Sequence, residues 1–182
     1  MTLLLFVALI TASNPPRRRA ALSVDSTRIV ALGALLGAAL LIVSAAIATP
    51  LLDALDTSAP NLRIGVGVVV GFAGLHDLVR RVPGPGAALD GDRAALVPVF
   101  FPVLARPDVA LLALAGGADH GVAVTAAAAA LAMAAVVGWH AIATARANRP
   151  VFRRIELALA RLLAAATVVA GVLVTVDGVF SI

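Results

Sequence analysis

The feature that most constrains the fold of this chain is an apolar stretch, residues 97–110, that contains three prolines: Pro98, Pro102 and Pro107. Proline lacks a backbone N–H and its ring clashes with the preceding turn, so this run excludes an unbroken helix. Arg106 and Asp108 flank the last proline. Charged side chains in apolar sequence normally face a bundle interior or a water-filled cavity. The stretch therefore indicates an interrupted membrane helix whose charged residues face the bundle interior or a water-filled cavity.

A similar break lies near the N-terminus. Residues 6–22 form an apolar run that is interrupted at Pro15 and Pro16, with three arginines directly after the prolines. A pair of interrupted apolar segments in corresponding positions of two halves is the best sequence indicator of a transporter binding site. We interpret the rest of the chain as the scaffold around these two breaks.

The composition places the chain in the membrane class. Of its 182 residues, 62% are hydrophobic and 13% are charged, and the mean hydropathy is +1.05; soluble domains average about 45–50% apolar and about 25% charged residues. All 14 basic residues are arginine, a usage that resembles high-GC bacterial coding. Because the arginines cluster between apolar spans, we do not expect a nucleic-acid partner. The chain has no cysteine, which excludes disulfides, thiolate metal sites and a cysteine nucleophile.

The apolar pattern predicts about six spans in an all-α membrane protein. The predicted spans are residues 2–13, 29–49, 62–79, 94–115, 121–145 and 155–179, with a turn at 116–120. The first span is short, so it either enters the membrane only partway or continues past the proline break as a second half-helix. Residues 83–92 are rich in turn formers and separate a first three-helix repeat, 1–82, from a second, 93–182. An odd number of spans in each half inverts the second half relative to the first, and each half holds one proline-broken helix. Pro15 matches Pro107 in this repeat, and Asp77 matches Asp177.

The distribution of arginine predicts the orientation. The first, third and fifth loops carry the clusters at residues 17–28, 80–93 and 146–154, whereas the second and fourth loops carry little beyond Arg63. Cytoplasmic loops are enriched in arginine, so the odd loops lie in the cytoplasm and both termini lie on the extracytoplasmic side. We therefore expect a multi-pass protein embedded in the lipid bilayer.

The candidate substrate-binding residues lie at the two breaks: Asn14, Pro15, Arg106, Pro107 and Asp108. An interrupted helix exposes backbone polar groups, which lipid cannot satisfy and which a polar solute or water can. The guanidinium of Arg106 can bind a carboxylate with two parallel hydrogen bonds, or it can pair with Asp108. Asp108 is also a candidate for proton or ion coupling, together with Asp77 and Asp177.

Each of these residues also has a plainer interpretation. Arg106 and Asp108 could belong to an ordinary loop at the membrane surface, and Asp77 and Asp177 could be solvated helix caps. The arginines at 17–19 are best explained as a cytoplasmic topology signal. The three histidines follow no ligand spacing, and no nucleophile–base pair is visible, so the sequence predicts no metal site, no cofactor and no enzyme activity.

Glycines in the third predicted span indicate close helix packing. Gly67 and Gly71 are four residues apart, a spacing that lets another helix approach closely in lipid. The neighbouring helix could belong to this chain, to a second copy or to a larger membrane complex. We expect Gly71→Leu to disturb the packing.

Several short motifs resemble the MarC family of six-span bacterial inner-membrane proteins, which is similar in outline to the LysE-type exporters. These motifs are Asn14-Pro15, the Leu-Arg-Ile-Gly-x-Gly of residues 62–67, the proline-rich residues 97–107, and Asp177-Gly178-Val179. The chain departs from the family pattern at Arg106-Pro107-Asp108, where the family usually has Gly-Pro-Gly, and at Pro16 and the arginines that follow it. The resemblance implies a transporter or exporter of a small solute, with small neutral amino acids as the substrate class of some members. The alternative is a non-transporting accessory subunit of a larger membrane complex.

Overall fold

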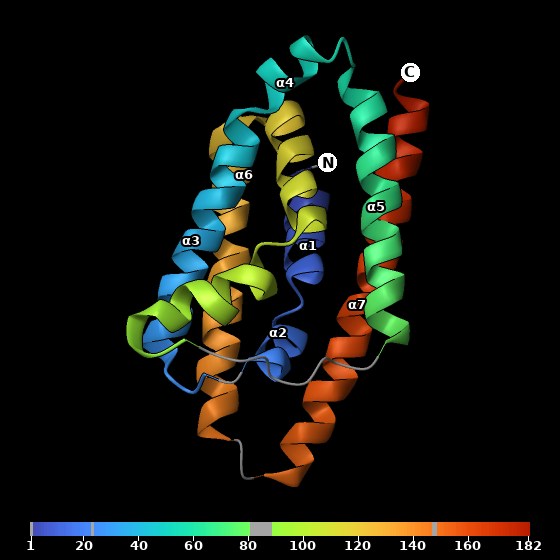
Figure 1. Cartoon of the computed structure of the whole chain (residues 1–182). Coiled ribbons are helices and arrows are strands. Elements are labelled where there is room, and N and C mark those ends of the chain that lie inside the picture. The colour runs from blue at the N-terminus through green and yellow to red at the C-terminus, as the bar shows by residue number, and fades with distance from the viewer. Residues whose placement is uncertain (1, 23, 81–88, 147–148) are drawn as a thin grey trace.

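The computed structural model describes the whole chain except residues 1, 23, 81–88 and 147–148. The described residues form helices and no strand (Figure 1). The elements in chain order are α1 (Thr2–Ser13), α2 (Pro15–Ala21), α3 (Thr27–Ala46), α4 (Ala48–Ala54), α5 (Ala59–Val79), η1 (Gly91–Ala95), η2 (Leu96–Leu104), α6 (Pro107–Ala145) and α7 (Pro150–Phe180). The predicted all-α class is confirmed. The central linker expected at 83–92 lies mostly outside the described residues.

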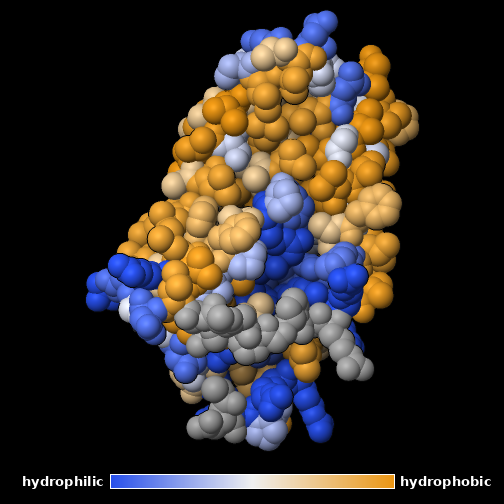
Figure 2. All heavy atoms as spheres, viewed as in Figure 1, coloured by the Kyte–Doolittle hydropathy of each residue, from blue (hydrophilic) through white to orange (hydrophobic). Residues whose placement is uncertain are grey.

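Four of these helices, α3, α5, α6 and α7, are long and apolar enough to cross a membrane. Many of their large apolar side chains are exposed, including Leu35, Phe72 and Leu162. Figure 2 shows this apolar surface over most of the visible face, with hydrophilic residues near the two ends and in one central area. An apolar surface of this extent is what a bilayer covers, so the fold is that of a multi-pass membrane protein.

The break predicted at Asn14 is present. α1 ends at Ser13 and α2 begins at Pro15, with Asn14 between them in a left-handed conformation, φ 43° and ψ 66°. The two prolines occupy the first turn of α2, where their missing N–H groups cost no hydrogen bond. The chain can therefore change direction at Asn14 and start a second helix at once.

The three prolines also have the expected effect. η2 is an irregular helical segment with non-helical dihedral angles at Val97 and Phe101, the residues that precede Pro98 and Pro102. A proline disfavours the helical conformation of the residue before it, which explains both positions. The regular helix α6 starts only at Pro107.

α6 is two helices joined at Gly121, and the turn predicted at residues 116–120 is placed wrongly. Gly121 has φ 79° and ψ 166°, a conformation essentially restricted to glycine. A Cβ atom on Gly116 would lie 3.0 Å from Thr125 Oγ1, whereas nine residues of straight helix span about 13.5 Å. The two arms therefore fold back on each other (Figure 1). Gly116 and Gly117 stay helical because they allow close contacts: a Cβ on Gly117 would meet the backbone of α3 at Ala45.

Glycines join α5 and α7 into a tight pair. A Cβ on Gly67 would lie 2.6 Å from Gly171 O, and a Cβ on Gly74 would lie 2.8 Å from Val168 N. The prediction for Gly67 is confirmed, and the adjacent helix belongs to this chain. Gly71 also allows the close approach, because a Cβ on Gly171 would lie 2.5 Å from Gly71 N. A Cβ on Gly71 itself would point away from α7 and meet nothing within 4 Å, so the structure gives no reason for Gly71→Leu to disturb the packing.

Candidate functional site

The candidate site is a buried cluster of charges around Asp77, on the last turns of α5. Its carboxylate lies 3.1 Å from Arg17 Nε, 3.3 Å from Arg18 Nη2 and 2.7 Å from Arg106 Nη1. The three arginine side chains are between 7% and 16% exposed, and that of Asp77 is 9% exposed. Asp77 is therefore a shared counter-ion for residues that follow the first break and precede the start of α6.

Arg17 and Arg18 are held by their place at the start of α2. Arg17 Nη1 donates to the carbonyl oxygens of Asp77, at 2.8 Å, and Arg80, at 3.2 Å. Arg18 Nε donates to Ser13 O at 3.1 Å. These oxygens lie in the last turns of α5 and α1, where carbonyls lack a partner within the helix. The two arginines thus donate hydrogen bonds to carbonyl groups at helix ends, which lipid could not do.

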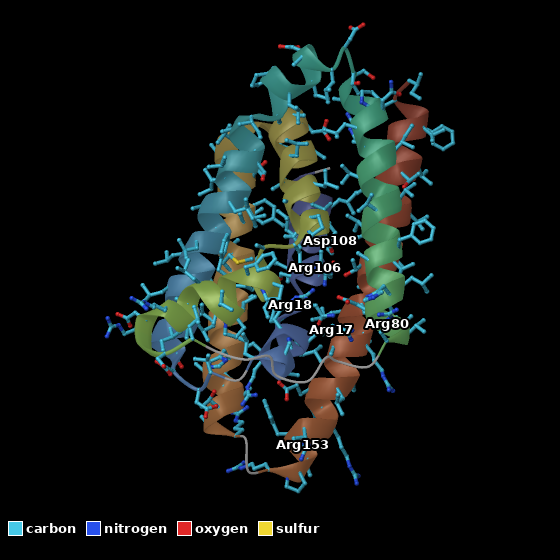
Figure 3. The ribbon with its side chains drawn as sticks, viewed as in Figure 1. Arg17, Arg18, Arg80, Arg106, Asp108 and Arg153 are labelled. Atoms are coloured by element: carbon cyan, nitrogen blue, oxygen red, sulfur yellow. The ribbon has the colours of Figure 1, made fainter. Side chains whose placement is uncertain are left out.

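Arg106 and Asp108 form a two-pronged ion pair. Arg106 Nε donates to Asp108 Oδ1, and Arg106 Nη2 donates to Asp108 Oδ2, each at 2.7 Å. Asp108 is 2% exposed and lies in the first turn of α6, where the helix dipole favours a negative charge. The interpretation of these two residues as an ordinary surface loop is therefore wrong. Figure 3 places Asp108 and Arg106 near the middle of the molecule, with Arg17 and Arg80 nearer the lower end.

Asn14 connects the first break to α7. Its side-chain nitrogen donates to Ala160 O at 2.9 Å, and its side-chain oxygen accepts from Arg17 N at 3.4 Å. The residue is 1% exposed. Both ends of the amide are thus engaged within the chain, and Asn14 fixes the shape of the break beside the cluster. Pro15 is buried and is the first residue of α2, whereas Pro107 is exposed and is the first residue of α6.

The third predicted coupling residue, Asp177, belongs to a different cluster. Asp177 Oδ2 lies 2.6 Å from Arg63 Nη1, and Asp119 Oδ2 lies 2.8 Å from Arg63 Nε. Arg63 is near the start of α5 and Asp77 is near its end, a separation of about 21 Å along the helix. Asp177 therefore does not join Asp77, and the sequence match between them reflects two separate ion-pair clusters.

The central cluster carries a net positive charge. Three arginines and two aspartates leave one positive charge uncompensated among the residues that form it. A charge is costly in a membrane interior unless it is paired or reaches water. The arrangement suits an incoming anion such as a carboxylate, which could bind the guanidinium fork of Arg106 in place of Asp108.

The part played by Arg17 and Arg18 was not predicted from the sequence. We expected both in a cytoplasmic loop as a topology signal, whereas both are at least 90% buried, at 6% and 9% exposed. Topology signals lie in the aqueous loops, so a purely topological role does not account for this burial. The available signal was their position directly after a break, together with an acid, Asp77, in another span. Asp77 itself is 8% exposed, so it is not a solvated cap.

Comparison of the chain with protein-family models, curated proteins and solved structures gave no match. The MarC resemblance remains an expectation from short motifs.

Proposed function

We propose that this chain moves a small carboxylate-bearing solute across the bacterial inner membrane, as a MarC-like transporter or exporter with small neutral amino acids as the expected class. The observation that carries the proposal is the meeting of both proline breaks at one carboxylate, Asp77. Broken segments of this kind at membrane depth are tolerated where they line a cavity or are buried in protein.

In this proposal the solute competes with an internal anion. The carboxylate of the solute replaces that of Asp108 as the hydrogen-bond partner of the Arg106 guanidinium group. The uncompensated positive charge of the cluster favours this exchange. Asp108 then accepts a proton or faces a coupling ion, and it returns to Arg106 when the solute leaves. Asp77 keeps the three arginines together while the partners exchange. Asn14 holds the first break against α7 throughout.

The proposed topology has six passes in two inverted halves. The first half consists of α1 with α2, then α3 and α5; the second consists of η2 with the first arm of α6, then its second arm and α7. Both termini lie on the extracytoplasmic side and the linker lies in the cytoplasm, in line with the arginine clusters. Single cysteines at Thr2, Ala87 and Ser181 test this in the cysteine-free chain. We expect an impermeant thiol reagent to label the first and last in intact cells and the linker only after permeabilisation; labelling of the linker alone contradicts the topology.

A flux assay in proteoliposomes tests the function. We expect uptake or efflux of one or more neutral amino acids by the wild-type chain, and loss of flux in Arg106→Gln. Arg28→Gln is the matched control, because Arg28 pairs with Asp92 at the surface, where its side chain is 77% exposed. Wild-type flux in Arg106→Gln would contradict the assigned site.

One observation favours the alternative of an accessory subunit. An apolar groove of about 350 Å³ runs along the outer side of the α5–α7 pair, lined by Gly71, Phe72, Val172 and neighbouring residues. A helix of a partner protein or of a second copy could lie in it. Purification of the native protein in a stoichiometric complex, with no flux of any neutral amino acid in the proteoliposome assay, would establish this alternative in place of transport.

A further inference from the structure

A second polar site lies beside the cluster, in a pocket of about 300 Å³ between α2, α5 and α7. Its charged lining consists of Arg17, Asp77, Arg80 and Arg161, and its apolar lining consists of Leu78, Val79, Leu157 and Ala160. The pocket therefore has three guanidinium groups from three helices and a single carboxylate.

The donors of this pocket are only partly used. Arg17 Nε and Nη1 bind Asp77 and two carbonyl groups, while Arg17 Nη2 has no hydrogen bond to any residue in the described part of the chain. The side chains of Arg80 and Arg161 have no ion pair within the same described residues, although both line the pocket. Asp77 is already shared by three arginines, so it leaves the pocket positively charged.

This set of donors fits a phosphate group. Guanidinium groups bind phosphate through parallel hydrogen bonds, and two or three of them around one pocket can neutralise a phosphate monoanion or dianion. A carboxylate is the weaker fit, because it offers two oxygens to donors that come from three directions.

The rim of the pocket indicates where the phosphate comes from. Val79 and Leu157 are 75% and 52% exposed and lie beside the arginines, on helices whose outer surface is apolar. Free phosphate gains nothing from contact with such side chains, whereas the acyl chains of a phospholipid do. Basic pockets between membrane helices are known sites for anionic head groups.

We propose that this pocket binds the phosphate of an anionic membrane phospholipid, with Arg17 at its base and Arg80 and Arg161 at its opening. The lipid fastens α2 and the end of α5 to the first half of α7. This proposal depends on the chain lying in a membrane and not on transport, so it stands or falls separately from the proposed function.

Native mass spectrometry of the full-length chain in detergent tests the proposal by counting bound lipids during titration with phosphatidylglycerol. We expect one tight site, absent with phosphatidylcholine. Removing one arginine near a membrane surface weakens attraction to an anionic lipid by about fivefold, so Arg80→Gln and Arg161→Gln should each raise the dissociation constant by that factor. Arg153→Gln is the matched control: Arg153 is also on α7, exposed at the same end, and does not line the pocket (Figure 3).

Three results would overturn either the pocket as the binding site or a phospholipid as the source of the phosphate. Equal lipid binding by wild type, Arg80→Gln and Arg161→Gln would remove the pocket as the site, as would equal weakening by Arg153→Gln. Displacement of the lipid by millimolar inorganic phosphate, with the same sensitivity to the two variants, would assign the pocket to a free anion instead. Because Arg80 and Arg161 are on different helices and both exposed, a folding defect in one variant leaves the other to decide.

Discussion

The substitution Asp77→Asn removes the charge on which the central cluster depends while it keeps the size of the side chain. In the wild type, the Asp77 carboxylate contacts Arg17 at 3.1 Å, Arg18 at 3.3 Å and Arg106 at 2.7 Å. Arg106 keeps Asp108 in the variant. Arg17 and Arg18 lose their carboxylate and keep only carbonyl acceptors. The variant therefore leaves two buried cations without a counter-ion.

The expected cost follows from these contacts. Removing one partner of a buried ion pair destabilises a protein by about 3–5 kcal/mol, because an uncompensated charge stays buried. Adding Arg17→Gln to Asp77→Asn removes one of the two unpaired cations. The double variant should then be more stable than the sum of the single effects predicts, by about 1–3 kcal/mol, as is typical of residues within one ion-pair network.

The free energy of unfolding in mixed detergent micelles, followed by circular dichroism, measures both quantities. The matched control is Asp92→Asn, which removes an exposed partner of Arg28 and should cost about 1 kcal/mol or less. Two results would refute the reasoning: an Asp77→Asn variant no less stable than Asp92→Asn, or strictly additive effects of Asp77→Asn and Arg17→Gln.

Two further predictions concern glycines, each with a glycine of the same chain as its control and thermal unfolding in detergent as the measurement. Gly67→Leu should destabilise the protein by about 1–3 kcal/mol through overpacking against α7, whereas Gly71→Leu, whose Cβ meets nothing within 4 Å, should unfold close to the wild type; the reverse order would contradict the assigned faces. Gly121→Ala should cost about 1–3 kcal/mol through backbone strain at φ 79°. Gly138→Ala, at an open helical position, should be neutral or stabilising by up to about 1 kcal/mol, and equal effects of these two would argue against the chain reversal at Gly121.

Much of the helical arrangement was predictable because apolar length and proline position act locally. The span predicted at 29–49 corresponds to α3, Thr27–Ala46, and the span at 62–79 corresponds to α5, Ala59–Val79. The position of the reversal in α6 was not predictable in this way. Gly116, Gly117 and Gly121 are all candidates for the reversal. Gly116 and Gly117 stay helical where they pack against α1 and α3, contacts that the local sequence does not show, and the chain turns at Gly121.

The site was predictable only in part, because its contacts join residues that are far apart in the sequence. The sequence singled out Arg106, Asp108 and Asp77 through the cost of charges in apolar segments. It could not show that Arg17 and Arg18 reach the same carboxylate, since arginines after a span normally mark the cytoplasmic side. Nor could it separate Asp77 from Asp177, which have similar neighbours and different partners.

The ion pair between Arg106 and Asp108 has a consequence for the biogenesis of the protein. Both charges lie on one segment, two residues apart, so this segment carries its own counter-ion as it leaves the translocon and can enter lipid as a neutral unit. Arg17 and Arg18 pair with Asp77, which is synthesised about sixty residues later, so their ion pairs cannot form until then. The N-terminal segment formed by α1 and α2 should therefore stay at the interface until α5 arrives, which gives the nascent chain a definite order of insertion.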